Sequence, residues 1–241
     1  LFTNASSNNT AVGSGVLALN TTGDDNTAVG TNALKTATTA TRNTAIGMDS
    51  MQALTTGSYQ TAVGQRTLYA NTTGTENTAM GYLAMDANTT GSYNVGLGVN
   101  ALGSNTTATY NTAVGTQAMI SATTGSQNVA VGAFALDAGT EVAGNTAIGY
   151  GALSATTANY NVAVGYNALD VCSTGTTNTA VGVNALGETT TGSQNVAVGL
   201  SAGNSITTGG NHLLLGYNSG NSGSPGGAIT TGNNEVTIGN G

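Results

Sequence analysis

The stretch Asn26-Thr27-Ala28-Val29-Gly30-Thr31-Asn32-Ala33-Leu34 decides the fold, because variants of it recur along nearly the whole chain. The glycine at its centre returns at a constant spacing of 17 residues from Gly13 to Gly149, and again from Gly165 to Gly216. A fixed period of this kind indicates a repeat protein whose units stack on one another.

Each repeat has the pattern of a β-structure. A 17-residue unit is too short for a helix-turn-helix, and Thr27-Ala28-Val29 alternates β-branched side chains with a small one, which is typical of a strand. Glycine, asparagine, threonine and serine between these segments favour turns. The sequence therefore predicts an all-β parallel β-solenoid (β-roll) of about 14 coils, with two short strands in each coil.

Two apolar rows are expected to fill the interior. The valine row is the residue directly before each repeat glycine, and the leucine row is the residue four places after it. As far as Leu186, both rows exchange apolar residues only for other apolar residues of similar size, as core positions do. The predicted core comprises Val29, Ile46, Val63, Val114, Val131, Leu34, Leu102 and Leu136.

An asparagine row lies four residues before the repeat glycine, and Gln60 replaces asparagine in one coil. Amide side chains at identical places in stacked coils can hydrogen-bond along the stack. We therefore interpret the row as a structural ladder rather than a catalytic feature. The predicted ladder includes Asn26, Asn43, Asn77, Asn94, Asn111 and Asn128.

An alanine row lies two residues before the glycine, on the opposite face of the strand from the valine row. A flat strip of small side chains allows another backbone to approach closely, and small closed oligomers bury strips of this kind. We expect this row to form an oligomer interface; the alternative is that alanine only keeps the outer face thin. The residues are Ala28, Ala45, Ala62, Ala113 and Ala130.

The repeat pattern weakens toward the C-terminus. Residues 1–216 are predicted to form the repeat solenoid, and residues 217–241 an irregular closing coil or a junction to a following domain. The alternating alanine is lost in Leu213-Leu214-Leu215, and the last unit is lengthened around Pro225, the only proline. Terminal repeats of solenoids are atypical because they cap an open stack.

Composition excludes several partners. Charged residues make up 5% of the chain, with three Lys and Arg against ten Asp and Glu and a net charge of −7. A chain with so few cations cannot neutralise many phosphates, so neither nucleic acids nor anionic membrane surfaces are expected partners. No run of 18 apolar residues occurs, so membrane insertion of this segment is not expected.

The residues needed for common catalytic and metal sites are scarce. His212 is the only histidine and Cys172 the only cysteine, and the acidic residues fall at differing places in the repeat. A cluster of histidine metal ligands cannot form within one chain, and a Ser-His-Asp triad is not expected. We expect no enzyme activity, no catalytic residues, no metal and no cofactor.

Four tyrosines stand directly before the asparagine-row position. Aromatic rings on a solvated face can stack on sugars, so these tyrosines are candidates for glycan contact. The alternative is that they shield strand edges or pack between protomers. The residues are Tyr59, Tyr93, Tyr110 and Tyr160.

The repeat resembles two groups of fibrous proteins. Asn161-Val162-Ala163-Val164-Gly165 and Asn128–Gly132 are similar to the repeats of trimeric autotransporter adhesin heads, and Asn88–Gly98 looks like the repeat arrays of bacteriophage tail fibres. Both resemblances imply a homotrimer of left-handed parallel β-rolls, located outside the cell on a virion or a bacterial surface. The 17-residue period is longer than that of the adhesin heads, which favours the tail fibre.

Three functions follow as hypotheses. The first is a structural shaft or head segment of a phage tail fibre that presents or forms a host-attachment surface, with a host glycan or protein as partner. The second is a bacterial adhesin head. The third is an ice-binding solenoid, suggested by threonines such as Thr39, Thr56 and Thr73; against it, paired threonines are adjacent and so alternate faces.

Overall fold

The computed structural model describes residues 7–222 and 228–239. The chain is an all-β parallel β-solenoid, which confirms the predicted fold class. It divides into two compact units, unit 1 (Leu1–Thr124) and unit 2 (Gly125–Gly241), and each is described by itself.

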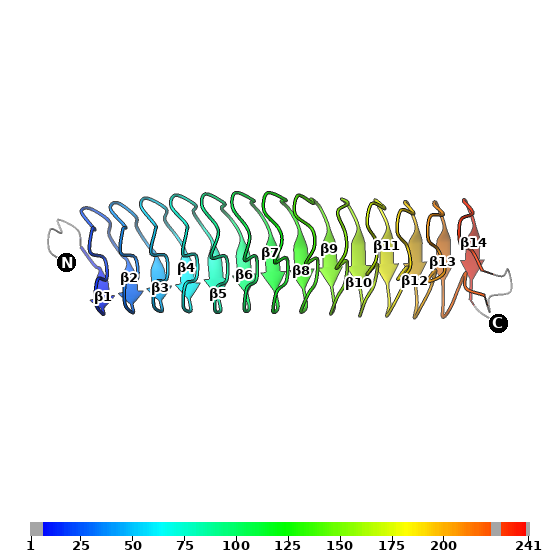
Figure 1. The fold of residues 1–241 in the computed structure, drawn as a ribbon, viewed down its shortest axis with the longest axis horizontal. Helices are drawn as coiled ribbons and strands as arrows, with labels where there is room; N and C mark the ends of the chain where they lie inside the picture. The colour runs from blue at the N-terminus through cyan, green and yellow to red at the C-terminus, as the bar shows by residue number, and fades with distance from the viewer. Residues whose placement is uncertain (1–6, 223–227, 240–241) are drawn as a thin grey trace. The chain divides into compact units, whose positions relative to one another are not determined.

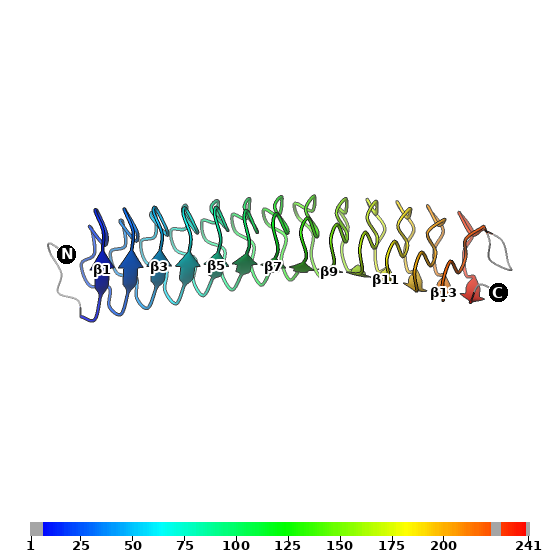
Figure 2. The same cartoon turned by 90° about the horizontal axis from the view of Figure 1, so that it is seen from below.

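Each coil contributes one strand of three residues, not the two strands that we predicted from the repeat. In both units the strands follow one another in the sheet in the order of the chain, as Figures 1 and 2 show from two sides. Unit 1 holds β1 (Thr10–Val12), β2 (Thr27–Val29), β3 (Thr44–Ile46), β4 (Thr61–Val63), β5 (Thr78–Met80), β6 (Val95–Leu97) and β7 (Thr112–Val114). Unit 2 holds β8 (Val129–Val131), β9 (Thr146–Ile148), β10 (Val162–Val164), β11 (Thr179–Val181), β12 (Val196–Val198), β13 (Leu213–Leu215) and β14 (Val236–Ile238).

Stacking places each residue beside its equivalent in the next coil. Ala28 pairs with Ala45, for example, and the strands run parallel. Hydrogen bonds join the coils outside the strands too, since the amide of Leu34 donates to the carbonyl of Ser50 at 3.1 Å. Most backbone groups of a coil are therefore satisfied by a neighbouring coil rather than within their own coil.

The chain turns its corners through residues in the left-handed region. In the second coil Asp25, Asn32 and Leu34 have φ values of 59°, 56° and 49°. Asparagine and aspartate tolerate this conformation, but leucine rarely adopts it, and a buried leucine must be held there by its surroundings. The leucine row repeats the same conformation in nearly every coil of both units.

Successive strand residues do face opposite sides, as predicted, but the buried and the exposed sides are exchanged relative to our prediction. The alanine row faces the interior and is fully buried, so the prediction that Ala28, Ala45, Ala62, Ala113 and Ala130 form an oligomer interface is wrong. The valine row points outward, so the prediction that Val29, Ile46, Val63, Val114 and Val131 belong to the core is also wrong. Leu34, Leu102 and Leu136 are fully buried, where we placed them.

Small side chains face inward because the leucine row already fills the interior from the opposite wall. A Cβ added at Gly96, which occupies an alanine-row position, would lie 2.9 Å from Cγ of Met85 in the leucine row. The two sizes are exchanged near the C-terminus: Gly203 stands in the leucine row, and a Cβ there would lie 2.7 Å from Cδ1 of Leu214 in the alanine row. The two rows therefore share one fixed volume, as close-packed interiors require.

The asparagine row forms a buried ladder in both units. The backbone amide of Asn43 donates to Oδ1 of Asn26 at 3.0 Å, and Nδ2 of Asn43 donates to the carbonyl of Gly57 at 3.1 Å. Asn94 and Asn111 in unit 1, and Asn145 and Asn128 in unit 2, repeat the bond from amide to Oδ1 at 3.0 Å. All six predicted ladder residues are buried. Each side chain thus ties together the coils on either side of it.

His212 takes the asparagine position in the coil of β13. Its amide donates to Oδ1 of Asn195 at 3.1 Å, its Nε2 lies 2.8 Å from the carbonyl of Gly232, and its Nδ1 accepts from the amide of Glu235 at 3.3 Å. Because Nδ1 is an acceptor, the ring proton belongs on Nε2, where it donates to the carbonyl. The imidazole therefore makes the same two bonds to the next coil that an asparagine makes.

Among the described residues of unit 1, Gln60 is a weak point of the ladder. Its longer side chain leaves Nε2 buried without a hydrogen-bond partner among the described residues, while its Oε1 accepts from Nδ2 of Asn77 at 3.2 Å. A buried unsatisfied amide group costs about 1–3 kcal/mol.

Gln60→Asn is therefore expected to raise the stability of unit 1 by about 1 kcal/mol, because Nδ2 would reach the loop carbonyl of the next coil, as Nδ2 of Asn43 and of Asn94 does. Thermal denaturation followed by circular dichroism measures the change. The reciprocal variant Asn94→Gln should lower the melting temperature, and an unchanged or lower melting temperature of Gln60→Asn would contradict the argument.

A second set of buried asparagines in the loops went unrecognised in the sequence. Asn88 donates to the carbonyl of Gly91 at 3.0 Å, and Asn105 donates to Oδ1 of Asn88 at 2.9 Å. The same position holds alanine, leucine or Cys172 in other coils. Because its residue type changes from coil to coil, the position looks like a variable loop until its burial is known.

The C-terminal segment continues the stack. β14 pairs with β13 in the same parallel register, and Leu213 lies beside Val236. Residues 228–239 therefore carry a further strand of the stack, and the choice between a closing coil and a junction to a following domain stays a prediction. The lengthened stretch around Pro225 falls on residues 223–227, which lie outside the described residues, as do residues 1–6 and 240–241.

Candidate functional site

The outward side of the strands is the principal candidate surface. We define the strand face as the first and third residues of β1–β7 in unit 1 and of β8–β14 in unit 2. These positions hold threonine, valine, isoleucine, leucine or methionine, and no charged residue in any coil. Ile46 and Met80 are 40% and 50% exposed. Each unit therefore presents a regular apolar surface to its surroundings.

A second row, with exposed large apolar or aromatic side chains in eight coils and Ser14, Thr31, Gln65 or Thr116 in others, follows the strand face. The post-glycine row is the residue directly after each repeat glycine and includes Met48, Tyr82 and Val99 in unit 1 and Tyr150, Tyr166, Val183, Leu200 and Tyr217 in unit 2. All eight side chains are exposed. Tyr150 and Tyr166 stack with ring centroids 5.5 Å apart. These rings continue the apolar surface beyond the end of each strand.

The tyrosine row, directly before the asparagine row, precedes the strand face. Tyr59, Tyr93, Tyr110 and Tyr160 are all exposed, and each holds a left-handed corner with φ near 61°. Tyr93 and Tyr110 stack with centroids 4.9 Å apart, and the guanidinium of Arg42 lies 5.3 Å from the ring centroid of Tyr59. The predicted glycan contact of these rings stays a prediction.

Charges in the tyrosine row affect its phenols. The carboxylate of Glu76 and, after it, the neighbouring Tyr110 raise the pKa of the Tyr93 phenol, because both disfavour a second negative charge. Arg42 pairs with Asp25 at 3.7 Å in an exposed position. An exposed ion pair of this kind contributes little to stability. The tyrosines of this row therefore interact with side chains of neighbouring coils and are not isolated rings.

Apolar exposure is concentrated on these surfaces. Of the large apolar and aromatic side chains that are exposed in the described residues, all but Leu19 and Val171 lie on the strand face, in the post-glycine row or in the tyrosine row. Contiguous apolar surface of this extent marks an interaction site in soluble proteins. The outward face of the strands is thus the part of each unit best suited to contact another molecule.

Catalytic and metal-binding groups do not gather in the described residues. No group of three or more His, Cys, Asp or Glu side chains is close enough there to hold a metal ion. Cys172 is buried, and burial raises the pKa of its thiol to about 11, so the nucleophilic thiolate is scarce at neutral pH. Within the same residues, no helix has the length and apolar character needed to cross a membrane.

Comparison of the chain with protein-family models, with curated proteins and with solved structures found no match. The candidate surface therefore has to be interpreted from its own chemistry.

Proposed function

We propose that the chain is a non-catalytic structural segment, shaft or head, of an extracellular homotrimeric fibre, in which the strand faces of three copies pack against one another. The single observation that supports it is the uncharged apolar strand face, which repeats in identical register from coil to coil in each unit. Identical parallel strips on identical chains suit a closed cyclic assembly, which buries the same surface on every copy.

The resemblance of the repeats to bacteriophage tail fibres supports a virion fibre that presents or forms a host-attachment surface. The head of a bacterial surface adhesin is the alternative that the same repeats favour. In either setting we propose that the outward-facing valine row, and not the buried alanine row, makes the trimer contact. The low content of Lys and Arg also makes nucleic acid an unsuitable partner.

The oligomeric state tests this proposal. Light scattering on a size-exclusion column should give three chains per particle for the unaltered protein. The double variant Ile46→Asp/Met80→Asp should give one chain, because it places carboxylates in a packed apolar contact, while its circular dichroism stays that of a β-protein. A monomeric unaltered protein would falsify the trimer.

A matched control separates the interface from a general effect of added charge. Thr39→Asp/Thr73→Asp adds the same two charges to unit 1 at exposed loop positions away from the strand face. This variant should remain trimeric. If both double variants dissociated, added negative charge at any position would be enough to separate the chains, and the strand face would not be identified as the contact.

Ice binding is the lesser proposal. An exposed threonine row favours it, formed by Thr39, Thr56, Thr73, Thr90 and Thr107 in unit 1. The adjacent threonines do not add to that surface, since Oγ1 of Thr38 donates to the carbonyl of Thr55 at 3.2 Å and Oγ1 of Thr72 to that of Thr89 at 3.1 Å. Thermal hysteresis of the purified protein tests it, and a solution without hysteresis would exclude it.

A further inference from the structure

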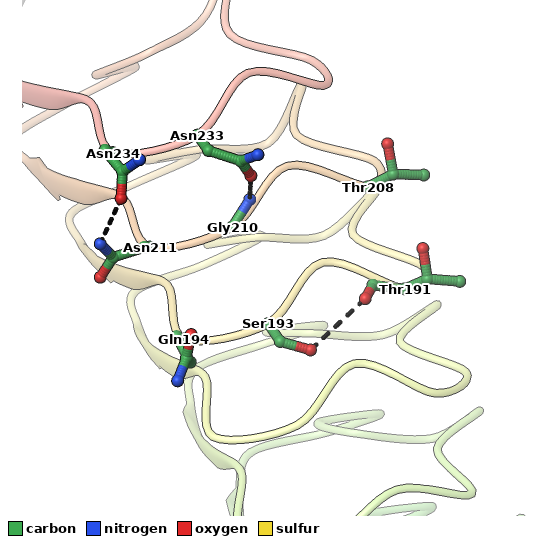
Figure 3. Close-up of a pocket in the computed structure, with 8 residues that line it drawn as sticks. All are labelled: Thr191, Ser193, Gln194, Thr208, Gly210, Asn211, Asn233 and Asn234. Carbon is green, nitrogen blue, oxygen red and sulfur yellow. Dashed lines mark hydrogen bonds between the residues drawn. The ribbon is translucent and has the colours of Figure 1, made fainter.

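An open polar notch lies in unit 2 beside the last three coils (Figure 3). Its cavity of about 420 Å³ falls within the range of small-molecule sites, about 300–1,000 Å³. Thr191 and Thr208 stand on one side of the notch, and Asn211 and Asn234 lie nearer the strands. The remaining lining residues are Ser193, Gln194, Gly210 and Asn233.

The notch exists because one side chain is missing from a regular row. The position two residues before the asparagine row holds Thr176, Ser193, Gly210 and Asn233 in successive coils. A Cβ added at Gly210 would lie 2.9 Å from the carbonyl oxygen of Ser193 and 3.8 Å from its amide nitrogen. The side chain of any other residue would therefore occupy this space, and glycine lets a ligand approach the backbone closely.

A backbone donor is also free in the notch. The amide of Thr176 donates to Oγ of Ser193 at 3.0 Å, and the amide of Gly210 donates to Oδ1 of Asn233 at 2.8 Å. The equivalent amide of Ser193 has no acceptor among the described residues, and Gly210 brings no side chain that could cover it. This N–H faces the space that the glycine leaves open.

The other polar groups of the notch retain much of their bonding capacity. Nδ2 of Asn211 donates to Oδ1 of Asn234 at 2.5 Å, which leaves the Oδ1 of Asn211 and the Nδ2 of Asn234 available. The side chains of Gln194, Thr191 and Thr208 have no hydrogen bonds within the described part of the chain. The notch thus offers several donors and acceptors within one small volume.

The composition of the lining selects the class of ligand. None of the eight lining residues is charged, so neither an anion nor a cation would find a counter-charge, and an apolar ligand would desolvate these amides without replacing their hydrogen bonds. A neutral polyol supplies alternating donors and acceptors that match amides and hydroxyls.

We propose that this notch binds one neutral pyranose unit of a glycan, with its hydroxyls on Gln194, Thr191, Thr208 and the amide of Ser193. This inference rests on the attachment role proposed above, for which it supplies a ligand class and a location. The site is shallow and its lining side chains are largely exposed. A single sugar should therefore bind weakly, with a Kd of about 1–10 mM, and repeated sites in an assembly would add avidity.

Saturation-transfer NMR on the whole chain tests the site. The probes are the methyl glycosides of glucose, galactose, mannose and N-acetylglucosamine, with N-acetylneuraminic acid as a charged comparison. At least one neutral glycoside should show transfer and titrate with a millimolar Kd, and the charged sugar should not. Gln194→Ala and Thr191→Val/Thr208→Val should each weaken the binding about tenfold or more, since each removes hydrogen bonds to the sugar.

Matched variants keep the result specific. Gln127→Ala changes the same left-handed corner position of unit 2 away from the notch, where φ is 63° against 62° at Gln194. Thr73→Val/Thr90→Val removes the same hydroxyls from exposed positions in unit 1. Both controls should bind as the unaltered protein does. No transfer to any neutral glycoside, or equal binding by the notch variants and their controls, would overturn the proposal.

The particle mass of every variant is measured in parallel. A trimer that binds no glycoside would reject the notch and leave the fibre intact. A monomer that binds a glycoside through Gln194 would reject the trimer and retain the notch. The two proposals can therefore fail separately.

Discussion

Ala113→Asp is expected to unfold the coils around β7, lowering the free energy of unfolding by about 3–5 kcal/mol. Ala113 is fully buried in the alanine row, and an aspartate there would place an unpaired carboxylate in an interior one side chain thick. The neighbouring position, Val114, points outward and is only partly buried. Val114→Asp should therefore leave the β-structure of a single chain nearly unchanged.

Thermal denaturation by circular dichroism measures both variants, and light scattering fixes their oligomeric state. They are best compared in the background of Ile46→Asp/Met80→Asp, so that loss of chain association does not enter the difference. If Val114→Asp lowered the melting temperature of a single chain as much as Ala113→Asp, the assignment of the two rows to the outer face and the interior would be reversed.

Gly47→Ala is expected to destabilise unit 1 by about 3 kcal/mol or more. Gly47 has φ near 136°, a conformation that side chains rarely adopt, and a Cβ there would lie 2.3 Å from the carbonyl oxygen of Gly64 in the next coil. Neither backbone can move away, because the amide of Gly47 also donates to the carbonyl of Val29 at 2.8 Å. The repeat glycine therefore sets how closely two coils approach.

Gly103→Ala is the matched control in the same unit. A Cβ at Gly103 would meet its nearest atom, the carbonyl oxygen of Asn100, at 3.3 Å, and other coils place Lys35, Gln52 or Tyr69 at this position. Its melting temperature should fall by at most a few degrees. Equal melting temperatures for the two variants would show that the close approach of the repeat glycines is not a stability determinant.

The repeat period alone was enough to predict the fold class. A fixed spacing, β-branched alternation and turn residues leave few architectures besides a parallel solenoid. The buried Asn26 and Leu34 also followed from the repeat, since a residue type that recurs at one place in every coil must satisfy the same contacts in every coil.

The alternation within each strand could not show which side of the strand faces the interior. Ala28 and Val29 face opposite sides, and size suggests that the larger side chain is the buried one. The leucine row on the opposite wall of the coil limits how large the buried strand residue can be. Met85 shows this, because a Cβ added at Gly96 would come too close to it. The sequence does contain one clue: Gly203 is small in the leucine row where Leu214 is large in the alanine row. If the two residues are taken as a compensating pair, they indicate that the alanine row faces the interior.

Two features of the candidate sites lay beyond sequence reasoning. The strand face became recognisable as a surface only when the valine row was found to be exposed. The notch depends on Gly210, which looks like one more loop glycine until the hydroxyl row that it interrupts is known. The free amide of Ser193 could not be predicted either, because it depends on which groups the neighbouring coil places beside it and not on the residue type.

The bonds between coils also determine how each unit responds to force. Because the amides of Thr27, Leu34 and Asn43 bond to the coil after or before their own, a pull along the stacking direction loads successive coil–coil contacts in series. The outermost contact then yields first, and each coil of 17 residues that peels away releases roughly 55–60 Å of chain. A stack built in this way lengthens in steps and dissipates work at each step.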